Sequence, residues 1–507
     1  MERGASTADR SPLVRVATDV AANGDEQIVT AMRDEADSIP VVRTGPVGVL
    51  GSEPLVMATR EGRTAFFAKP EPSTARDVVD TLEDGLIPAD DADAVVEHGP
   101  ETTSLPIPNT GPLSVGQRSV LARCGWVDPL DPNEWPIVSS DRAAEAVTDT
   151  GLLGRGRGDA AADGPVADAW ETARDADGDP VVVANANETR DEQRADEVLL
   201  GGAPIAVLDG IAAVAEYVGA DDAVVYLNEE DSHLHQHLRE AIEAVAGELP
   251  IVPQLVAGPD EYRAGAPTAA LEAMEGADRI EPRLQPPSPA THGLYGRPTV
   301  IHTPRTFAQV RRAIRDPDAF DADAADPGTR LITVAGDVAD PATIELPSDS
   351  SLSVVRDAVE LTGSFKMACV GGVLGGVTRS LDVAPTAQSL AAAGLGTDGV
   401  VELLNDDRCV VADVGERARF ASTENSGRCV PGREGTKQLT ELLRDVYQGS
   451  LETDTIRELG RVMTRSSNCQ IGAHAPRPVT TALDEFEPEF RAHADGRCPS
   501  GTCTEKL

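Results

Sequence analysis

Short apolar runs alternate with amphipathic stretches along most of this chain, and that alternation limits its fold more than any other feature. Segment 12–92 reads as a strand, a helix, a strand, two more strands and a helix, a small βαβ–ββα pattern. The apolar runs 180–186 and 222–228 continue the alternation, and the amphipathic stretch 237–249 follows the second run. Strands that alternate with helices are typical of α/β proteins, so we expect a multidomain α/β fold.

Changes in composition divide the chain into predicted parts. Strand-like runs at 329–338 and 342–347, a predicted helix at 351–363 and a glycine-rich turn indicate a small β-grasp-like module. From residue 416 onward apolar residues recur at intervals of three and four, which predicts a helical bundle. The predicted parts are an N-terminal module (12–92), a Pro/Asp/Thr-rich linker (93–110), an α/β domain (111–322), the β-grasp-like module (328–410), the helical bundle (416–495) and a tail (496–507).

The charge balance is strongly acidic. The chain has 85 Asp and Glu residues against 44 Lys and Arg residues, a net charge of −41 that is spread along its whole length. Such a surface suits concentrated salt, which screens the repulsion, so we expect the cytoplasm of a salt-loving organism. Nucleic acids and anionic membrane surfaces are poor partners for this charge.

The chain has no apolar run of the length that spans a membrane and no leader-like apolar segment at its start, so we expect no direct membrane insertion. Its seven cysteines are an odd number scattered through a long sequence, which favours a reducing compartment over a disulfide framework.

Five blocks of sequence, taken in order, resemble one family. They read GLLGRGRG (151–158), VVVANANE (181–188), EYRAGAPTAAL (261–271), PRLQPPSPATHGLYGRPTV (282–300) and SGRCVPGREGT (426–436). The chain resembles, over roughly residues 12–503, the NADH-binding flavoprotein subunit of respiratory complex I and its relative in NAD(P)-linked hydrogenases, as a degenerate member of haloarchaeal type. The resemblance implies a thioredoxin-like N-terminal module, a Rossmann-like FMN domain, an SLBB-like β-grasp module and a bundle of iron–sulfur-binding type.

The resemblance also implies a chemistry and a set of partners. In the family, NADH gives a hydride to FMN, which passes single electrons to a [4Fe–4S] cluster and on to other subunits of a redox complex. Glycines let the backbone approach a phosphate closely, as such a cofactor loop requires. The resemblance carries the cofactor-binding positions over to Gly154, Arg155, Gly156, Asn185 and Glu188. The protein would then work in the cytoplasm and reach any membrane complex only through its partners.

Several positions around the expected cofactor cleft depart from the family pattern. Arg157 stands where the family has a glycine, and Ala160 stands where an aromatic packs near the nicotinamide. Ala266 and Pro267 replace two glutamates. Further departures are Asp159, Asp163, Asn187, His302 and Thr303.

These departures leave three functions open. The chain is an NADH- and FMN-binding oxidoreductase subunit, or a docking or assembly paralogue that keeps the shape without the cofactors, or a flavin- or nucleotide-binding protein with altered chemistry and no cluster.

The expected cluster loop is also altered. The family loop carries three cysteines and a later helix turn carries the fourth, but here Ser426 and Gly432 take the places of two of them. Cys429 and Cys469 would be the remaining cluster ligands. Because a [4Fe–4S] cube needs four thiolates, we expect no such cluster. Residues 1–110 contain no cysteine, which also excludes a [2Fe–2S] centre there.

A second group of metal-binding residue types lies at the tail. His493, Cys498 and Cys503 are spaced as H-x4-C-x4-C, and an imidazole with two thiolates suits zinc. No fourth ligand is evident in the sequence, and the alternative is two free thiols in a frayed terminus. Cys124, Cys369 and Cys409 lie in apolar surroundings and are expected to be buried structural thiols.

Overall fold

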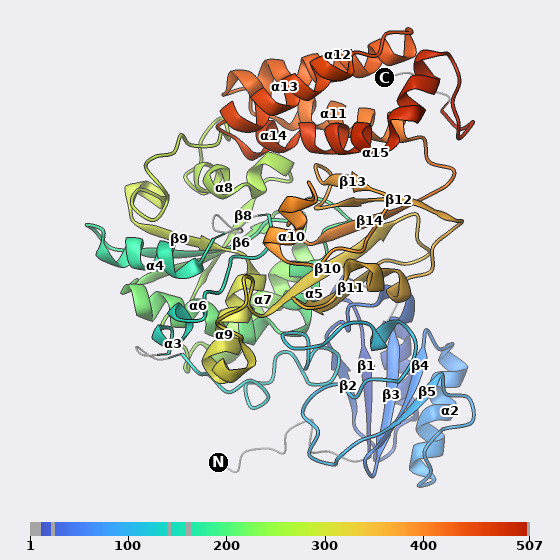
Figure 1. The fold of residues 1–507 in the computed structure, drawn as a ribbon. Coiled ribbons are helices and arrows are strands. Elements are labelled where there is room, and N and C mark those ends of the chain that lie inside the picture. Colours follow the sequence, from blue (N-terminus) through green and yellow to red (C-terminus); the bar gives the residue numbers. More distant parts are fainter. Residues whose placement is uncertain (1–11, 22–25, 140–142, 158–163, 504–507) are drawn as a thin grey trace.

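The structure is a computed structural model that describes residues 12–21, 26–139, 143–157 and 164–503. In these ranges it contains three sheets and a group of C-terminal helices (Figure 1). The N-terminal sheet lies at one end, the helices lie at the other, and two further sheets lie between them.

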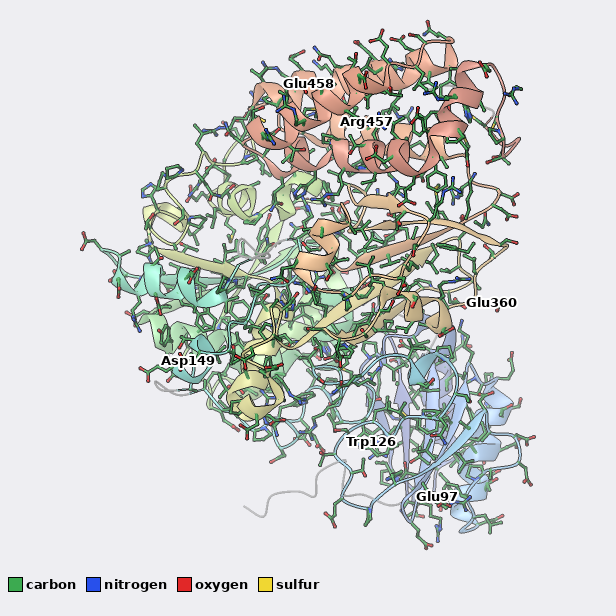
Figure 2. The ribbon with its side chains drawn as sticks, in the orientation of Figure 1. Glu97, Trp126, Asp149, Glu360, Arg457 and Glu458 are labelled. Carbon is green, nitrogen blue, oxygen red and sulfur yellow. The ribbon has the colours of Figure 1, made fainter. Side chains whose placement is uncertain are left out.

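The N-terminal sheet has the strand order β2-β1-β3-β4-β5. Only β1 and β2 run parallel. One face packs on α1 and α2 through residues such as Val14, Val56 and Val79, which confirms the predicted βαβ–ββα order. The other face packs on a long irregular segment through Trp126, which is buried beside the sheet (Figure 2). The elements are β1 (Leu13–Ala17), α1 (Glu26–Glu35), β2 (Val41–Thr44), β3 (Leu55–Arg60), β4 (Arg63–Ala68), α2 (Pro72–Glu83) and β5 (Ala94–Glu97).

The structure corrects the predicted linker 93–110. Residues 94–97 form the edge strand β5, which pairs antiparallel with β4. Its burial alternates between half-buried and exposed residues, and its apolar run is only the three residues 94–96, too short to stand out as a strand in the sequence.

The second sheet is entirely parallel and has the order β8-β7-β6-β9. The chain runs outward from β6 to β7 and β8, then returns to place β9 on the other side of β6. Ligands of open α/β sheets bind outside the carboxyl ends of the strands at such a switch point. The elements are α4 (Val166–Asp175), β6 (Val181–Ala186), α5 (Ala195–Gly202), α6 (Pro204–Val218), β7 (Asp222–Asn228), α7 (Ser232–Val245), β8 (Gln254–Gly258), α8 (Pro267–Met274), β9 (Thr299–His302) and α9 (Pro304–Arg315).

The third sheet is mixed and has the order β11-β10-β14-β12-β13. The stretch 351–363, predicted as a helix, contains only a short 3₁₀ segment at Leu352–Ala358, because the chain then turns back to let Leu361 bridge to Val338. The elements are β10 (Thr329–Gly336), β11 (Ala342–Pro347), β12 (Phe365–Val370), β13 (Gly376–Thr378), α10 (Ala387–Ala392) and β14 (Val400–Asn405).

The C-terminal helices form the predicted bundle, whose first helix begins at Val410, ahead of the predicted boundary at 416. The tail does not fray within the described residues: the hydroxyls of Ser500 and Thr502 donate to the carbonyls of Arg408 and Asp407. The helices are α11 (Val410–Glu424), α12 (Thr436–Tyr447), α13 (Thr453–Ser466), α14 (Gln470–His474) and α15 (Pro476–Ala494).

Among the described helices, none is by itself long and apolar enough to cross a membrane. The pair α5 and α6, bent by 98°, passes that test by length and composition only.

Candidate functional site

The predicted flavin loop is bound to the start of α9, directly after β9. The backbone N–H of Arg155 donates to the hydroxyl of Thr306 at 2.8 Å, and the hydroxyl of Thr303 donates to the carbonyl of Arg155 at 2.5 Å. Gly156 has a φ of +79°, and a Cβ there would lie 2.5 Å from Arg305 Nη2. Position 156 therefore needs glycine, both for its backbone conformation and for its contact with Arg305.

The Arg155 side chain points into the protein and is held there. Its guanidinium pairs with Asp326 at 2.9 Å and donates to the carbonyls of Leu153, Pro327 and Thr329. Because Thr329 is the first residue of β10, these hydrogen bonds join the loop to that strand.

A buried ion network fills the switch point between β6 and β9. The Arg305 guanidinium donates to Asp196 at 2.9 and 3.0 Å and to Glu188 at 3.1 Å. Burial and the charge of Asp196 raise the pKa of Glu188 well above its ordinary value. Burial alone would lower the pKa of Arg305, but the charges of Asp196 and Glu188 raise it. Sequence reasoning found Glu188 and missed Arg305 and Asp196, which lie 109 residues apart.

Asn185 and Arg157 both reach the segment Tyr262–Gly265. The Asn185 amide donates to the carbonyl of Gly265 at 3.1 Å. The guanidinium of Arg157 lies 3.6 Å from the Tyr262 ring centroid and donates to the Tyr262 carbonyl at 2.7 Å. A side chain of the protein itself thus bridges the cleft between the loop and this segment. Asp159, Ala160 and Asp163 lie outside the described residues.

The two histidines of the altered cleft differ in their surroundings. His302 is buried, and its Nε2 accepts a hydrogen bond from Trp170 Nε1 at 2.8 Å. It also packs between the rings of Trp170 and Phe307. His292 lies exposed beside Gly296. His302 therefore belongs to the core.

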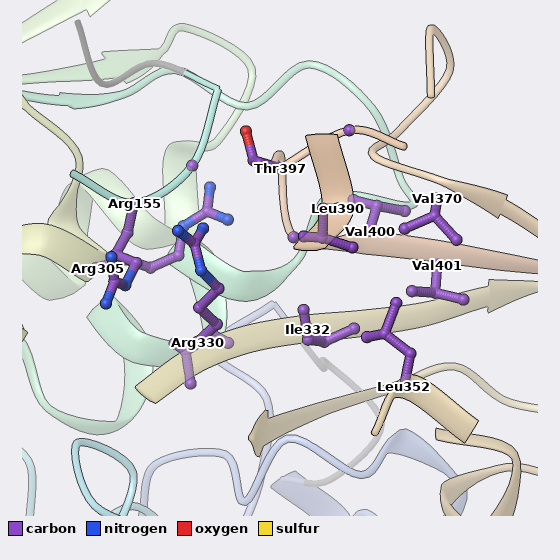
Figure 3. Close-up of a pocket in the computed structure, with 14 residues that line it drawn as sticks. Arg155, Arg305, Arg330, Ile332, Leu352, Val370, Leu390, Thr397, Val400 and Val401 are labelled. Atoms are coloured by element: carbon purple, nitrogen blue, oxygen red, sulfur yellow. The ribbon is translucent and has the colours of Figure 1, made fainter. Parts of the chain in front are cut away.

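The space left beside the loop is small. A cavity between Gly156 and the third sheet measures about 10 Å³, room for about one water. Figure 3 shows Arg155, Arg305 and Arg330 gathered at one end of it and apolar side chains at the other. Among the described residues, which do not include 158–163 of the loop, this cavity is too small for a flavin.

A larger cleft of about 250 Å³ lies beyond the carboxyl ends of β6 and β7. Burial raises the pKa of Glu197 there to about 7. Acidic side chains outnumber basic ones in its lining, which disfavours a phosphate: the charged residues are Glu188, Asp191, Glu197, Glu230, Asp231, Asp260, Arg190 and Arg194.

Cys429 and Cys469, the expected remnant of a cluster site, form a close pair. Their sulfurs are 3.5 Å apart and both residues are buried. A Cβ at Gly432 would lie 3.0 Å from one sulfur and 3.2 Å from the other, so the loop backbone packs against both thiols. Burial raises the pKa of Cys469 to about 12. Two thiols do not supply the four thiolates of a cube, so these residues alone do not fit a [4Fe–4S] cluster.

A four-residue Cys/His group lies where the tail meets the bundle. One ligand atom from each of Cys409, His493, Cys498 and Cys503 lies within 4.8 Å of all the others. Cys409 Sγ is 3.2 Å from His493 Nε2, and His493 Nδ1 lies 2.7 Å from the carbonyl of Glu489. Cys409 is buried, as expected for a structural thiol, and the fold also brings its sulfur beside the three tail residues, a contact that the spacing in the sequence does not reveal.

Comparisons with known proteins agree with this architecture. Residues 147–312 match a family model described as the Nuo51 FMN-binding domain. Residues 414–493 match the NADH-ubiquinone oxidoreductase-F iron-sulfur binding region. The expectation of no [4Fe–4S] cluster is therefore not supported, since the chain matches such a region and also holds the four-residue Cys/His group.

Whole-chain relatives cover most of the sequence. The NADH-quinone oxidoreductase F subunit of Streptomyces coelicolor is 31% identical over an alignment of 382 residues that covers 70% of this chain and 83% of that protein. The corresponding F 2 subunit of Rhizobium meliloti is 32% identical over an alignment of 389 residues that covers 71% of this chain and 90% of that protein. The alpha subunit of the NAD-reducing hydrogenase HoxS of Cupriavidus necator is 28% identical over an alignment of 484 residues that covers 87% of this chain and 74% of that protein.

A solved structure has the same fold. A chain of the NAD⁺-reducing [NiFe]-hydrogenase in the H₂-reduced state matches with a TM-score of 0.66 and 24% identity, over 95% of this chain and 84% of that chain. From these relatives, the protein belongs to the family of the NADH-quinone oxidoreductase F subunits and the related NAD(P)-linked hydrogenase subunits.

Proposed function

We propose that this chain is the flavoprotein-type subunit of a multi-subunit redox complex that takes electrons from NADH. The observation that carries the proposal is the place of the glycine-rich loop. Gly154 and Gly156 meet the switch point of a parallel sheet, where Asn185 lies near the end of β6 and Glu188 follows the strand. We expect the protein to work in a high-salt cytoplasm and to meet any membrane complex through its partners.

The parts of the chain take the roles that the family suggests. We propose a thioredoxin-like module for 12–92 together with β5, a Rossmann-like flavin domain for 111–322 and an SLBB-like β-grasp module for 328–410. The helices from Val410 to residue 495 would be the bundle of iron–sulfur-binding type.

A second candidate function is a docking or assembly subunit without its own flavin. It is favoured by the filled cleft: Arg157 lies on Tyr262, and Arg305 occupies the space beside Gly156. On this alternative the family fold serves to present docking surfaces to partner subunits, and ion pairs and stacking fill the cleft.

Flavin binding separates the two candidates. The chain is purified anaerobically in molar KCl, FMN is added, and bound flavin is followed by its absorbance and by NADH oxidation with ferricyanide. Stoichiometric FMN and flavin-dependent turnover support the flavoprotein role, whereas absence of both supports the docking role.

Arg157→Gly sharpens this test because it restores the glycine of the family and removes the guanidinium from Tyr262. If the filled cleft is what excludes flavin, this variant gains FMN binding that the unchanged chain lacks. Arg279→Gly is the matched control, since Arg279 is 76% exposed in a surface segment. An equal gain in both variants contradicts a role for Arg157.

We also propose that Cys409, His493, Cys498 and Cys503 hold one zinc ion. Thiolate and imidazole ligands bind zinc at about 2.0–2.3 Å, so four ligand atoms within 4.8 Å of one another suit a single tetrahedral ion. A four-iron cube would hold its thiolates farther apart. His493 Nδ1 can donate to the Glu489 carbonyl, which leaves Nε2 free as a ligand.

Metal analysis of the purified chain tests this site. We expect about one zinc per chain, lost in Cys498→Ser and kept in Cys429→Ser, whose thiol lies outside the group. Because the ligands must be deprotonated, zinc should be released as the pH falls. Iron with acid-labile sulfide in place of zinc would contradict the assignment.

A further inference from the structure

A cavity of about 460 Å³ lies between the helical bundle and the loop after α10. Arginines from two helices line it: Arg457, Arg461 and Arg465 from α13 and Arg477 from the first turn of α15. Figure 2 shows Arg457 and Glu458 on the outer part of this bundle. Asp and Glu are missing from its described lining, although they outnumber Lys and Arg by 85 to 44 in the whole chain.

The α13 arginines form a stripe. Arg457, Arg461 and Arg465 stand four residues apart, so they share one face of the helix. Like charges at this spacing destabilise a helix unless an anion lies between them.

Carboxylates outside the cavity neutralise only part of this stripe. Arg457 pairs with Asp484 at 2.9 Å, and Arg461 pairs with Glu458 at 2.6 Å. Within the described part of the chain, Arg465 and Arg477 have no carboxylate partner. The guanidinium groups of Arg465 and Arg477 therefore have no negative counter-charge from the described part of the chain.

Arg477 is held at the edge of the cavity. A Cβ at Gly396 would lie 2.6 Å from Arg477 Nη1, so the loop after α10 passes directly beside the guanidinium. Burial lowers the pKa of nearby His474 to about 3, and the positive charges of Arg477 and Arg157 add to this shift. This close backbone contact fixes the position of the Arg477 guanidinium but does not neutralise its charge.

We propose that this cavity binds a phosphorylated small molecule. Guanidinium groups match phosphate oxygens in pairs of hydrogen bonds, and arginines that converge from two helices enclose such a group. The volume and the apolar part of the lining, which includes Leu395 and Pro476, leave room for an organic body beside the phosphate. The site uses none of the residues assigned above to flavin or metal, so it does not depend on the proposed function.

Titration calorimetry of the full chain with inorganic pyrophosphate and with AMP, at constant ionic strength in a chloride-poor buffer, tests the site. We expect a dissociation constant below about 1 mM for at least one probe. Arg465→Ala and Arg477→Ala should each weaken binding at least about tenfold, and the double variant should abolish it.

The exposed Arg465 gives a variant expected to fold, and thermal unfolding checks each protein. Arg444→Ala is the matched control, because Arg444 is exposed on the neighbouring helix α12 and does not line the cavity. No binding of either probe, or equal weakening by Arg444→Ala and Arg465→Ala, overturns the proposal. The proposal is also overturned if poly-glutamate binds in an Arg465-dependent way while neither phosphate probe binds, since that result assigns the cavity to an acidic protein segment.

Discussion

Glu53 is a single buried carboxylate with a consequence for the stability of the protein. Its Oε1 accepts hydrogen bonds from the backbone N–H groups of Val47 and Gly48 at 2.9 and 3.0 Å, while Oε2 is buried without a hydrogen-bond partner. Burial and the charge of Asp19 raise the pKa of Glu53 from 4.5 to about 7. Between these values the folded state binds more protons than the unfolded state, so the free energy of unfolding falls as the pH rises.

Glu53→Gln should therefore stabilise the protein at pH 8 and make its stability less dependent on pH between 5 and 7. The glutamine keeps an acceptor for Val47 and Gly48 without the buried charge. The shift from 4.5 to about 7 corresponds to on the order of 3 kcal/mol at most. Unfolding temperatures of both proteins at pH 5, 7 and 8 check this; parallel pH profiles would contradict it.

The cysteines show which contacts can be predicted from the sequence and which cannot. The family positions of Cys429 and Cys469 predict that the two lie together, and their sulfurs do meet. The apolar residues around Cys409 in the sequence predict only a core thiol. Its contact with His493 spans 84 residues and arises only when β14, α11 and α15 pack together. A metal motif with one distant ligand is therefore incomplete when read from spacing alone.

At the scale of elements, helices α6 and α9 pack with their backbones in close contact. A Cβ at Gly210 of α6 would lie 2.2 Å from the carbonyl oxygen of Phe307 in α9. Gly210→Ala should cost about 1–3 kcal/mol or more, because backbone cannot move aside as a side chain can. Gly247→Ala is the matched control, with no heavy atom within 4 Å and no positive φ. Urea unfolding of the two variants compares them; equal stability would refute the close contact.

The salt bridge that joins α11 to the third sheet gives a second prediction at this scale. Arg417 is buried and donates to both oxygens of Glu402 at 2.9 Å, and it also pairs with Asp413 at 2.9 Å. Arg417→Ala leaves these carboxylates buried without their partner and should cost about 3–5 kcal/mol. Arg419→Ala, exposed on the same helix, should change stability by less than about 0.5 kcal/mol. Urea unfolding in constant salt measures both, and similar losses would exclude a special role for the buried pair.

The elements that the sequence predicts well are those with strong local signals. Every residue of β6 is buried and its first four residues are all apolar, and α13 carries a regular amphipathic pattern. The segment Leu352–Ala358 has apolar spacing that predicts a helix, yet a bridge between Val338 and Leu361 limits it to a 3₁₀ turn. The filled cleft is also beyond sequence reasoning, because Arg157 and Arg305 meet their partners only in three dimensions.

At the scale of the whole molecule, the net charge of −41 acts on every part of the fold. Like charges on a compact surface repel one another, and unfolding spreads them apart, so repulsion favours the unfolded chain at low salt. The screening length falls from about 10 Å at 0.1 M salt to about 3 Å at 1 M. The stabilising effect of salt should therefore be steep below 1 M and level off above it.

We expect the unfolding temperature to rise by about 3 °C or more between 0.1 M and 1 M KCl, because each kcal/mol of relieved repulsion raises it by about 1 °C in a chain of this size. The rise should be much smaller from 1 M to 2 M. Sucrose at matched osmolarity is the control, because it stabilises proteins by exclusion from their surface without screening charge. A similar rise in sucrose, or an unfolding temperature independent of KCl, would show that screening of the acidic surface is not what stabilises this fold.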